Sequence, residues 1–442
     1  MSARPARLPN RPARLFLAIT GFVAGTALAA GSAGTAFAAS STAIPATAAP
    51  AAVTTTNASD IGLFGVQDPT YDGVYRQSLA LIALVSTGHT PDAKAVSWLL
   101  SQQCADGAFT AYRADPSVAC TAGQEDENAT ALAIQALVVL GKPAANAVAA
   151  LKHFQLSDGG FYDNTAFGAP ASDANSTGLA LSALAAAGID PASVTSSGKS
   201  GDDYLRSVQL DCSATTGAGA YDYQPEATLA ANDYATVQAA LGQLGKALPV
   251  APGSVATSVP ACAAATGAAG SASNAIGYLA ARLTATGGAL PSAFGSGTDW
   301  TTTANAVLDL VAAGQGSAAV TAGAGALSTN AKAYSQSAGA DAPGPLATML
   351  LVAHATSADP ASFGGLDLPS ALAGTERLTV ALPSPSPVAT PSTGTGTGTG
   401  AGPTLPMTGS NAVAPLCTLG AALLALGGIA LTVSRRRASE SA

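Results

Sequence analysis

Charged side chains are scarce in this sequence of 442 residues, and basic residues are scarcer than acidic ones. Asp, Glu, Lys and Arg together make up 10% of the chain, whereas an average soluble protein contains ~25%. Between residues 39 and 434 there are 11 Lys and Arg against 25 Asp and Glu, a net charge of about −14. Such an acidic chain is a poor partner for nucleic acids and for anionic membranes.

Residues that bind transition metals are also few, with five cysteines and three histidines in the whole chain. No two cysteines have the spacing Cys-x-x-Cys, and the histidines at 89, 153 and 354 share no ligand spacing with them. The sequence therefore predicts no metal site.

The N-terminal residues 1–38 have the organisation of a signal peptide. Four arginines precede an uncharged apolar run at 15–30, and Ala36-Phe37-Ala38 supplies an A-x-A cleavage site. Cleavage between Ala38 and Ala39 by signal peptidase would export the chain. A short membrane anchor is the alternative.

The C-terminal residues 405–442 contain a short motif, an apolar run and a basic tail, in that order. The motif consists of Leu405, Pro406, Met407, Thr408 and Gly409. The uncharged run 412–433 is long enough to cross a bilayer as a helix, and the arginines at 435–437 would hold the tail in the cytoplasm.

This order resembles the LPxTG sorting signal of Gram-positive surface proteins. The resemblance implies that a sortase cleaves between Thr408 and Gly409 and joins Thr408 covalently to peptidoglycan. The expected location is then the cell wall, with a membrane-spanning helix present only before sorting.

Composition divides the rest of the chain into three parts. Residues 39–59 are a flexible lead-in rich in Ala and Thr, and residues 381–404 are a Pro/Ser/Thr/Gly linker suited to crossing the wall. Residues 60–380 remain as one folded domain, large enough to bury a sizeable core.

Four cysteines lie in the predicted domain, and Cys417 lies in the apolar run that sorting removes. The four are Cys104, Cys120, Cys212 and Cys262. An even number in an exported chain predicts disulfides, for which three pairings exist. We favour Cys104–Cys120 and Cys212–Cys262, because each closes a local segment.

Six apolar, Ala/Leu-rich runs are each led by an acidic residue or Asn, and most end in Gly. This is the pattern of helices with an N-cap and a C′ glycine. The leading aspartates are Asp72, Asp126, Asp173, Asp233, Asp299 and Asp341. Because these runs are apolar nearly all round, the helices should be buried on every side.

More amphipathic segments, such as TPDAKAVSWLLSQQ and DDYLRSVQL, separate the apolar runs. Alternation of buried and half-exposed helices predicts an all-α fold, an α/α toroid with about six inner and five to six outer helices. An open solenoid is the alternative.

One phrase recurs at the ends of the amphipathic segments: WLLSQQCADGAF at 98–109 and LKHFQLSDGGF at 151–161. Units of this kind, each followed by an acid-led helix, resemble the prenyltransferase/squalene-cyclase repeat superfamily. That superfamily includes cobalamin carriers of the intrinsic factor/transcobalamin type. The resemblance covers residues 60–355 and implies that the Gln and Gly-aromatic residues tie adjacent outer helices together.

The catalytic signatures of this superfamily are missing from the chain. There is no Asp-x-Asp-Asp and no Gly-Cys-Gly-Glu-Gln, and Asp211 and Cys212 are adjacent rather than separated as in zinc prenyltransferases. We therefore expect a protein that binds rather than catalyses. An extracellular cyclase- or prenyltransferase-like enzyme and a structural or adhesive module are the alternatives.

The predicted binding site is one rim of the ring, where all six inner helices would begin. The six aspartates would lie there as caps, and nearby aromatic side chains would complete a ligand pocket. The aromatic candidates are Tyr112, Tyr162, Tyr221, Tyr234 and Trp300. Resemblance to the carriers makes a corrinoid (cobalamin-like) or another bulky amphipathic molecule the candidate ligand, although their second, β-rich domain has no counterpart here. A purely structural role as caps is the alternative.

Overall fold

The computed structural model describes residues 62–165, 168–225, 228–337 and 339–376. The predicted signal peptide, lead-in, linker and sorting signal, including the span 412–433, lie outside these ranges. Within them, no helix is both long and apolar enough to cross a membrane.

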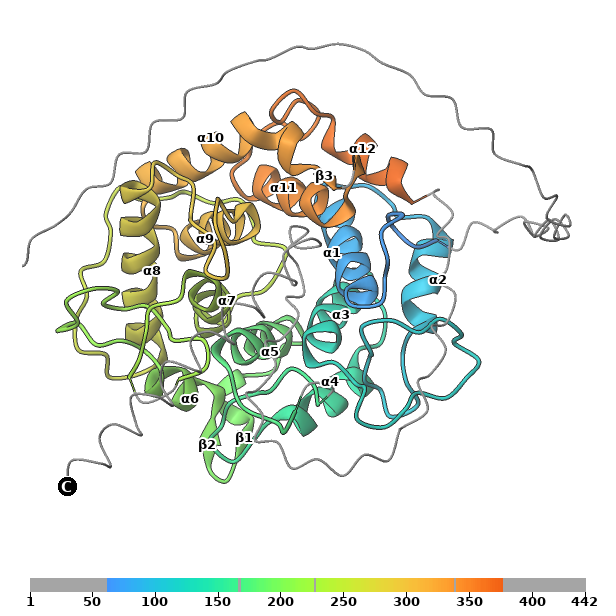
Figure 1. Cartoon of the computed structure of the whole chain (residues 1–442), viewed down its shortest axis with the longest axis horizontal. Coiled ribbons are helices and arrows are strands. Elements are labelled where there is room, and N and C mark those ends of the chain that lie inside the picture. Colours follow the sequence, from blue (N-terminus) through green and yellow to red (C-terminus); the bar gives the residue numbers. More distant parts are fainter. Residues whose placement is uncertain (1–61, 166–167, 226–227, 338, 377–442) are drawn as a thin grey trace, which may run out of the picture. The chain divides into compact units, whose positions relative to one another are not determined.

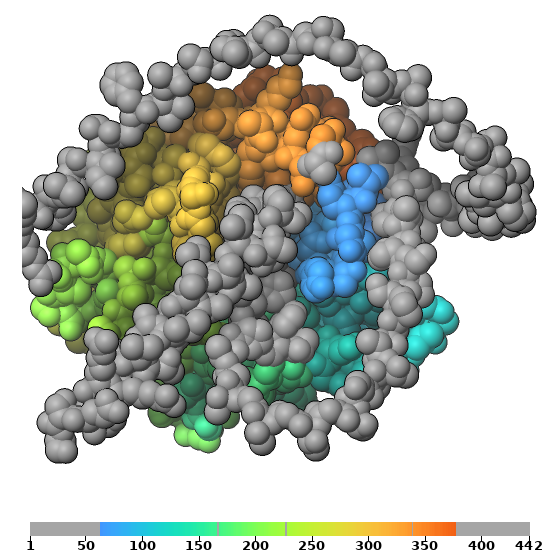
Figure 2. All heavy atoms as spheres, viewed as in Figure 1, coloured from blue at the N-terminus to red at the C-terminus, as the bar shows by residue number. Residues whose placement is uncertain are grey.

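Six helices form an inner ring in the described part of the chain (Figure 1). Each contacts the next inner helix, and the last contacts the first, so the ring is closed. These helices are α1 (Gly73–Ser86), α3 (Glu127–Val139), α5 (Ala174–Ala186), α7 (Asp233–Gln243), α9 (Trp300–Ala313) and α11 (Pro343–Ala355). In Figure 2 the blue beginning and the orange end of the described chain lie side by side, in agreement with the contact between α1 and α11.

An outer helix follows and packs against each inner helix. The outer helices are α2 (Ala93–Ser101), α4 (Ala145–Leu151), α6 (Gly201–Ser207), α8 (Ala268–Ala285), α10 (Ser317–Tyr334) and α12 (Leu368–Thr375). The predicted all-α class is confirmed, and the alternation of inner and outer helices runs through the whole described region.

Short elements complete the described fold. Two 3₁₀ turns, η1 (Lys152–Phe154) and η2 (Pro191–Ser193), follow α4 and α5. Two antiparallel hairpins of two-residue strands pair β1 (Thr195–Ser196) with β2 (Lys199–Ser200) and β3 (Gln336–Ser337) with β4 (Ala340–Asp341).

The inner helices are held close by small residues. In α3 every residue from Glu127 to Leu137 is buried, as the apolar sequence predicts. Gly178 of α5 and Gly242 of α7 allow the closest approach: a Cβ on Gly242 would lie 2.1 Å from the carbonyl oxygen of Gly178. Only glycine fits this contact.

The recurrent phrase joins three helices at each turn. Gln155 Nε2 donates to the carbonyl oxygens of Gly159 at 2.9 Å and of Val194 at 3.1 Å. Val194 lies in the segment that leads to the next outer helix, α6. The N–H of Phe161 donates to Thr177 Oγ1 on the following inner helix, α5, at 2.9 Å. The corresponding bonds recur at Gln103, Phe109, Gln209 and Tyr221. The phrase therefore has a structural role.

Two disulfides join the helical units, with the pairing that we favoured from the sequence. Cys104–Cys120 closes the loop between α2 and α3, with 5.7 Å between Cα atoms. Cys212–Cys262 links the segments after α6 and before α8 across 5.5 Å.

Candidate functional site

The inner helices begin at the same end of the ring. Backbone bonds join the start of each of the first three to the loop that leads into the next inner helix. The N–H groups of Val74, Glu127 and Ala174 donate to the carbonyl oxygens of Ala111, Asp163 and Tyr223, at 2.9, 2.8 and 3.1 Å. The starts of these three helices therefore lie next to the loops that lead into their neighbours, as expected for helices that begin at one rim.

Three of the six rim aspartates act as N-caps. Asp126, Asp173 and Asp299 accept hydrogen bonds from Ala129, Ser176 and Thr302 N–H groups at 2.7, 2.7 and 2.9 Å. All three side chains are buried. Such caps contribute about 0.5–2 kcal/mol each to stability. Their side chains bind the helix ends, and none of the three lines the central cavity described below.

Asp72 and Asp341 do not cap their helices, which corrects the sequence interpretation. Asp72 occupies the N-cap position of α1 but pairs with Arg76 at 2.9 Å instead. Asp341 is an exposed residue of β4, and α11 begins two residues later with Pro343 at its first helical position. Pro345, the third residue of this helix, lacks an N–H group that a cap side chain could bind, so the helix has less need of a cap.

Asp233 is likewise not the cap of α7. The neighbouring Asn232 caps the helix by accepting from the Ala235 N–H at 3.0 Å. Asp233 instead pairs with Arg282 of α8 at 2.6 Å and accepts a hydrogen bond from Tyr278. Its role in the described structure is to join α7 to α8.

The structure does not gather the five aromatic candidates around one pocket. Tyr221 is fully buried and its hydroxyl bonds to Gln243 and Ser271. The other four lie apart: Tyr112 stacks on Trp98, Tyr162 packs against Phe154, Tyr234 packs against Tyr223 and Phe294, and Trp300 opens α9.

Four acidic side chains lie together where α3 and α5 begin. They are Asp126, Glu127, Asp163 and Asp173. Burial raises the pKa of Asp126 to about 6, of Asp173 to about 7 and, with the neighbouring carboxyls, of Asp163 to about 9. Burial and the same neighbours raise the pKa of Glu127 well above its usual range.

The carboxyl groups of this acidic cluster differ in their hydrogen bonds. Asn128 Nδ2 donates to Asp163 Oδ1 at 3.0 Å, while neither carboxyl oxygen of Glu127 has a hydrogen-bond partner among the described residues. No three His, Cys, Asp or Glu side chains of the described region lie close enough together to bind a metal.

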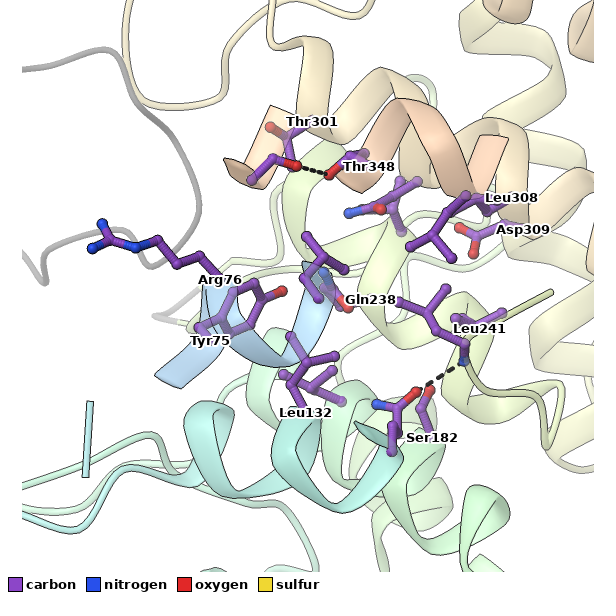
Figure 3. Close-up of a pocket in the computed structure, with 18 of the residues that line it drawn as sticks. Tyr75, Arg76, Leu132, Ser182, Gln238, Leu241, Thr301, Leu308, Asp309 and Thr348 are labelled. Atoms are coloured by element: carbon purple, nitrogen blue, oxygen red, sulfur yellow. Dashed lines mark hydrogen bonds between the residues drawn. The ribbon is translucent and has the colours of Figure 1, made fainter. Parts of the chain in front are cut away.

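A central cavity lies between the inner helices, and all six contribute to its wall (Figure 3). Each of the six helices contributes at least one apolar side chain, among them Leu79, Leu132, Leu179, Val237, Leu308 and Leu351. The space between the lining atoms amounts to about 800 Å³, but the centres of water-sized molecules can occupy only about 50 Å³ of it. The larger volume includes open solvent, so the smaller volume describes the enclosed space. The cavity is therefore narrow.

The rim aspartates contribute little to this cavity. Of the eleven candidates chosen from the sequence, only Asp72 lines it. Asp72, Thr301 and Gly344, all partly exposed, form the end that reaches the rim, which we call the mouth. At the other end, Gln135 and Asp309 are buried.

Polar side chains on α9 form a stripe along the cavity wall. Thr301, Asn305 and Asp309 recur every four residues, so they lie on one face of the helix, and all three line the cavity. Asp309 is 1% exposed, and its Oδ2 has no hydrogen-bond partner in the described structure. Burial raises its pKa well above the usual range, because the apolar surroundings disfavour the charged form of the carboxyl group.

Gln135 of α3 brings a second incompletely satisfied polar group to the inner end. Its Oε1 accepts a hydrogen bond from the Leu248 N–H at 2.9 Å, which fixes the segment after α7 against the cavity wall. Its Nε2 is buried and has no partner among the residues that the structure describes.

The sequence interpretation missed these cavity residues, although a signal was present. Asp309 is the one acidic residue inside the apolar run WTTTANAVLDLVAA, and Gln135 interrupts ENATALAIQALVV in the same way. A polar residue in a helix that is buried all round must face another polar group, water or a ligand.

Comparison with known proteins adds little. No protein-family model and no curated protein matches the chain. Among solved structures, a protein from Actinoplanes has 15% identity and a TM-score of 0.39, with 63% of this chain and 76% of that chain covered.

Two structures of the type II terpene cyclase MstE from Scytonema also match. An apo variant has 15% identity and a TM-score of 0.38, covering 71% of this chain and 90% of that one. A variant in complex with geranylgeranyl dihydroxybenzoate has 14% identity and a TM-score of 0.38, covering 72% and 92%. Likenesses this weak carry no argument about function.

Proposed function

We propose that this is an exported, wall-anchored surface protein whose helical ring binds a slender amphipathic molecule in its central cavity without catalysing a reaction. The observation that carries the binding proposal is the pair of unsatisfied polar groups, Asp309 Oδ2 and Gln135 Nε2, at the inner end of the cavity. A buried polar group without a partner costs ~1–3 kcal/mol, and a ligand that supplies the partner would recover this cost.

The narrowness of the cavity limits the size of the ligand. Water needs ~10–15 Å³ of such centre volume per molecule, so the 50 Å³ present corresponds to a few waters. A single hydrocarbon chain is little wider than a row of waters, whereas a corrin macrocycle is many times wider. The cavity therefore supports a chain-like ligand, and a corrinoid is the weaker candidate.

A soluble fragment of residues 60–380 allows a direct test. It contains all twelve helices of the ring, whose ends are joined by a bond from Gly65 N–H to the Thr375 carbonyl oxygen at 3.1 Å. A ligand present at 100 times its Kd should raise the free energy of unfolding by ~2.7 kcal/mol. Thermal unfolding in the presence of short-chain amphiphiles and of cobalamin measures this. If none of them shifts the transition, the binding proposal fails.

The anchoring proposal needs a separate experiment on cells that express a sortase. Thr408→Ala should leave the full-length protein in the membrane fraction, because the scissile Thr-Gly bond is altered. The unsubstituted protein should be released with the wall by muramidase. Equal release of the two proteins would contradict the sorting assignment.

A further inference from the structure

A polar stripe on α9 and a row of leucines on other inner helices line the cavity, and Gln135 of α3 and Ser182 of α5 add two polar side chains to the leucine side. Thr301, Asn305 and Asp309 line it from α9, while the facing helices α1, α3 and α5 contribute Leu79, Leu132 and Leu179. Two turns separate Thr301 at the mouth from Asp309 at the inner end, a rise of about 12 Å. A ligand that fills this length therefore meets a hydrogen-bonding group at its inner end and leucines along its flank.

The free hydrogen-bonding capacity is concentrated at the inner end. Asn305 is half-buried, and Asp309 Oδ2 and Gln135 Nε2 are buried without partners in the described residues. By contrast, the hydroxyl of Thr348 on α11 is already used, because it donates to the Gly344 carbonyl oxygen at 2.9 Å. Together, the side chains of Asn305, Asp309 and Gln135 can both donate and accept hydrogen bonds.

Opposite charge is missing from this inner end. Besides Asp309 itself, the acidic and basic residues that line the cavity are Asp72 and Arg76. Arg76 bonds to Asp72 and to the Gln67 carbonyl oxygen at 2.8 Å, and Figure 3 shows its guanidinium directed away from the interior. An anion brought to Asp309 would lose its hydration without gaining a fixed counter-ion, which is costly. A cation would meet only the carboxyl of Asp309, whose charged form is disfavoured by burial.

We propose that Asp309 and Asn305 select the hydroxyl group of a linear aliphatic alcohol, which enters hydroxyl first and lays its chain against Leu79, Leu132 and Leu179. This inference rests on the proposed function and specifies the ligand class of the same cavity. A hydroxyl both donates and accepts, so it satisfies the carboxyl and amide groups without carrying charge into the apolar interior. Asp309 is the specificity-determining residue.

Three eight-carbon probes that differ only in their terminal group test the inference: 1-octanol, octanoate and octylamine. Calorimetric titration of the 60–380 fragment at pH 7 should show 1-octanol binding at least tenfold more tightly than either charged probe. Asp309→Leu should weaken 1-octanol binding about tenfold or more, the value of one lost hydrogen bond of about 1.4 kcal/mol. Asp309→Asn, which keeps a donor and an acceptor, should stay within a few-fold of the unsubstituted fragment.

Thr348→Val is the matched control. It removes a polar atom from the cavity wall, but one that is already bonded within its own helix, so 1-octanol affinity should be unchanged. Tighter binding of octanoate or octylamine, or full 1-octanol affinity in Asp309→Leu, would overturn the selection by Asp309 and leave the proposed function standing. Binding of none of the three probes would contradict the proposed function itself.

Discussion

Close contact with neighbouring backbone requires glycine at one position of each recurrent phrase. Gly159 has φ +92°, and a Cβ at this position would lie 2.3 Å from the carbonyl oxygen of Ser200, which caps α6. The equivalent distances are 2.4 Å at Gly107 and 2.5 Å at Gly219. Conformation and space thus both exclude a side chain here, because L-residues avoid positive φ and the backbone cannot move away cheaply.

Substitution of two glycines separates these effects. Gly188 has φ +72°, yet a Cβ there would meet no atom within 4 Å. Gly188→Ala should therefore cost only the left-handed conformation, about 1–2 kcal/mol. Gly159→Ala should cost ~1–3 kcal/mol more because of the contact with Ser200. Denaturant unfolding of both variants measures the difference, and equal losses would show that the backbone contact is unimportant.

The buried carboxyl group of Asp309 should lower the stability of the ligand-free protein. Its carboxyl is buried at 1% exposure, with Oδ2 unsatisfied within the described structure. Replacing it with Leu should raise the free energy of unfolding of the ligand-free fragment by about 1–3 kcal/mol, because the desolvation cost disappears. Urea unfolding measures this. A destabilised Asp309→Leu would mean that the carboxyl is satisfied, through water for example, and that it supports the fold.

At the scale of elements, periodicity and cap residues located the inner helices well. The apolar run led by Asp126 is α3, Glu127–Val139, and Asp126 caps it as expected. Individual caps were less predictable, since Asp72 and Asp233 have arginine partners from one turn away and from another helix. A sequence pattern cannot show that such a partner is within reach.

The two disulfides stabilise the links between helical units to different extents. The sequence separations are 16 residues for Cys104–Cys120 and 50 for Cys212–Cys262. In the chain-entropy description the longer loop gains more, about 4 kcal/mol against about 3. Serine pairs at each disulfide, compared by denaturant unfolding, should differ by roughly 1 kcal/mol. A larger loss at Cys104–Cys120 would show that local packing outweighs loop length.

At the scale of the whole molecule, the cavity was harder to predict than the ring. An inner helix that is apolar on every side gives no sign of which face turns inward. We predicted the rim aspartates as ligand-binding residues because caps are recognisable in sequence. The side chains of Asp126, Asp173 and Asp299, however, accept hydrogen bonds from the N–H groups of their own helices. Only the isolated polar residues inside apolar runs, Gln135 and Asp309 among them, marked the interior.

The acidic cluster at the starts of α3 and α5 makes the stability of the whole ring depend on pH. Burial raises the pKa of Asp173 to about 7 and of Asp126 to about 6 in the folded protein, whereas an unfolded Asp has a pKa of ~3.9. Between these values the folded state binds more protons than the unfolded state, so stability falls as pH rises. The contribution of these groups is complete below pH ~4 and is lost as pH rises through 6 and 7.

We therefore expect the 60–380 fragment to melt several degrees lower at pH 8 than at pH 5. For Asp173 alone, a shift of about three pKa units corresponds to at most ~4 kcal/mol. Asp173→Asn provides the control, because Asn caps a helix as well as Asp does but does not titrate. The variant should show a shallower fall of Tm between pH 5 and pH 8. A Tm that is constant or rises over this range in the unsubstituted fragment would mean that the cluster binds no excess protons in the folded state. Its carboxyl groups would then be compensated by bound cations or water instead.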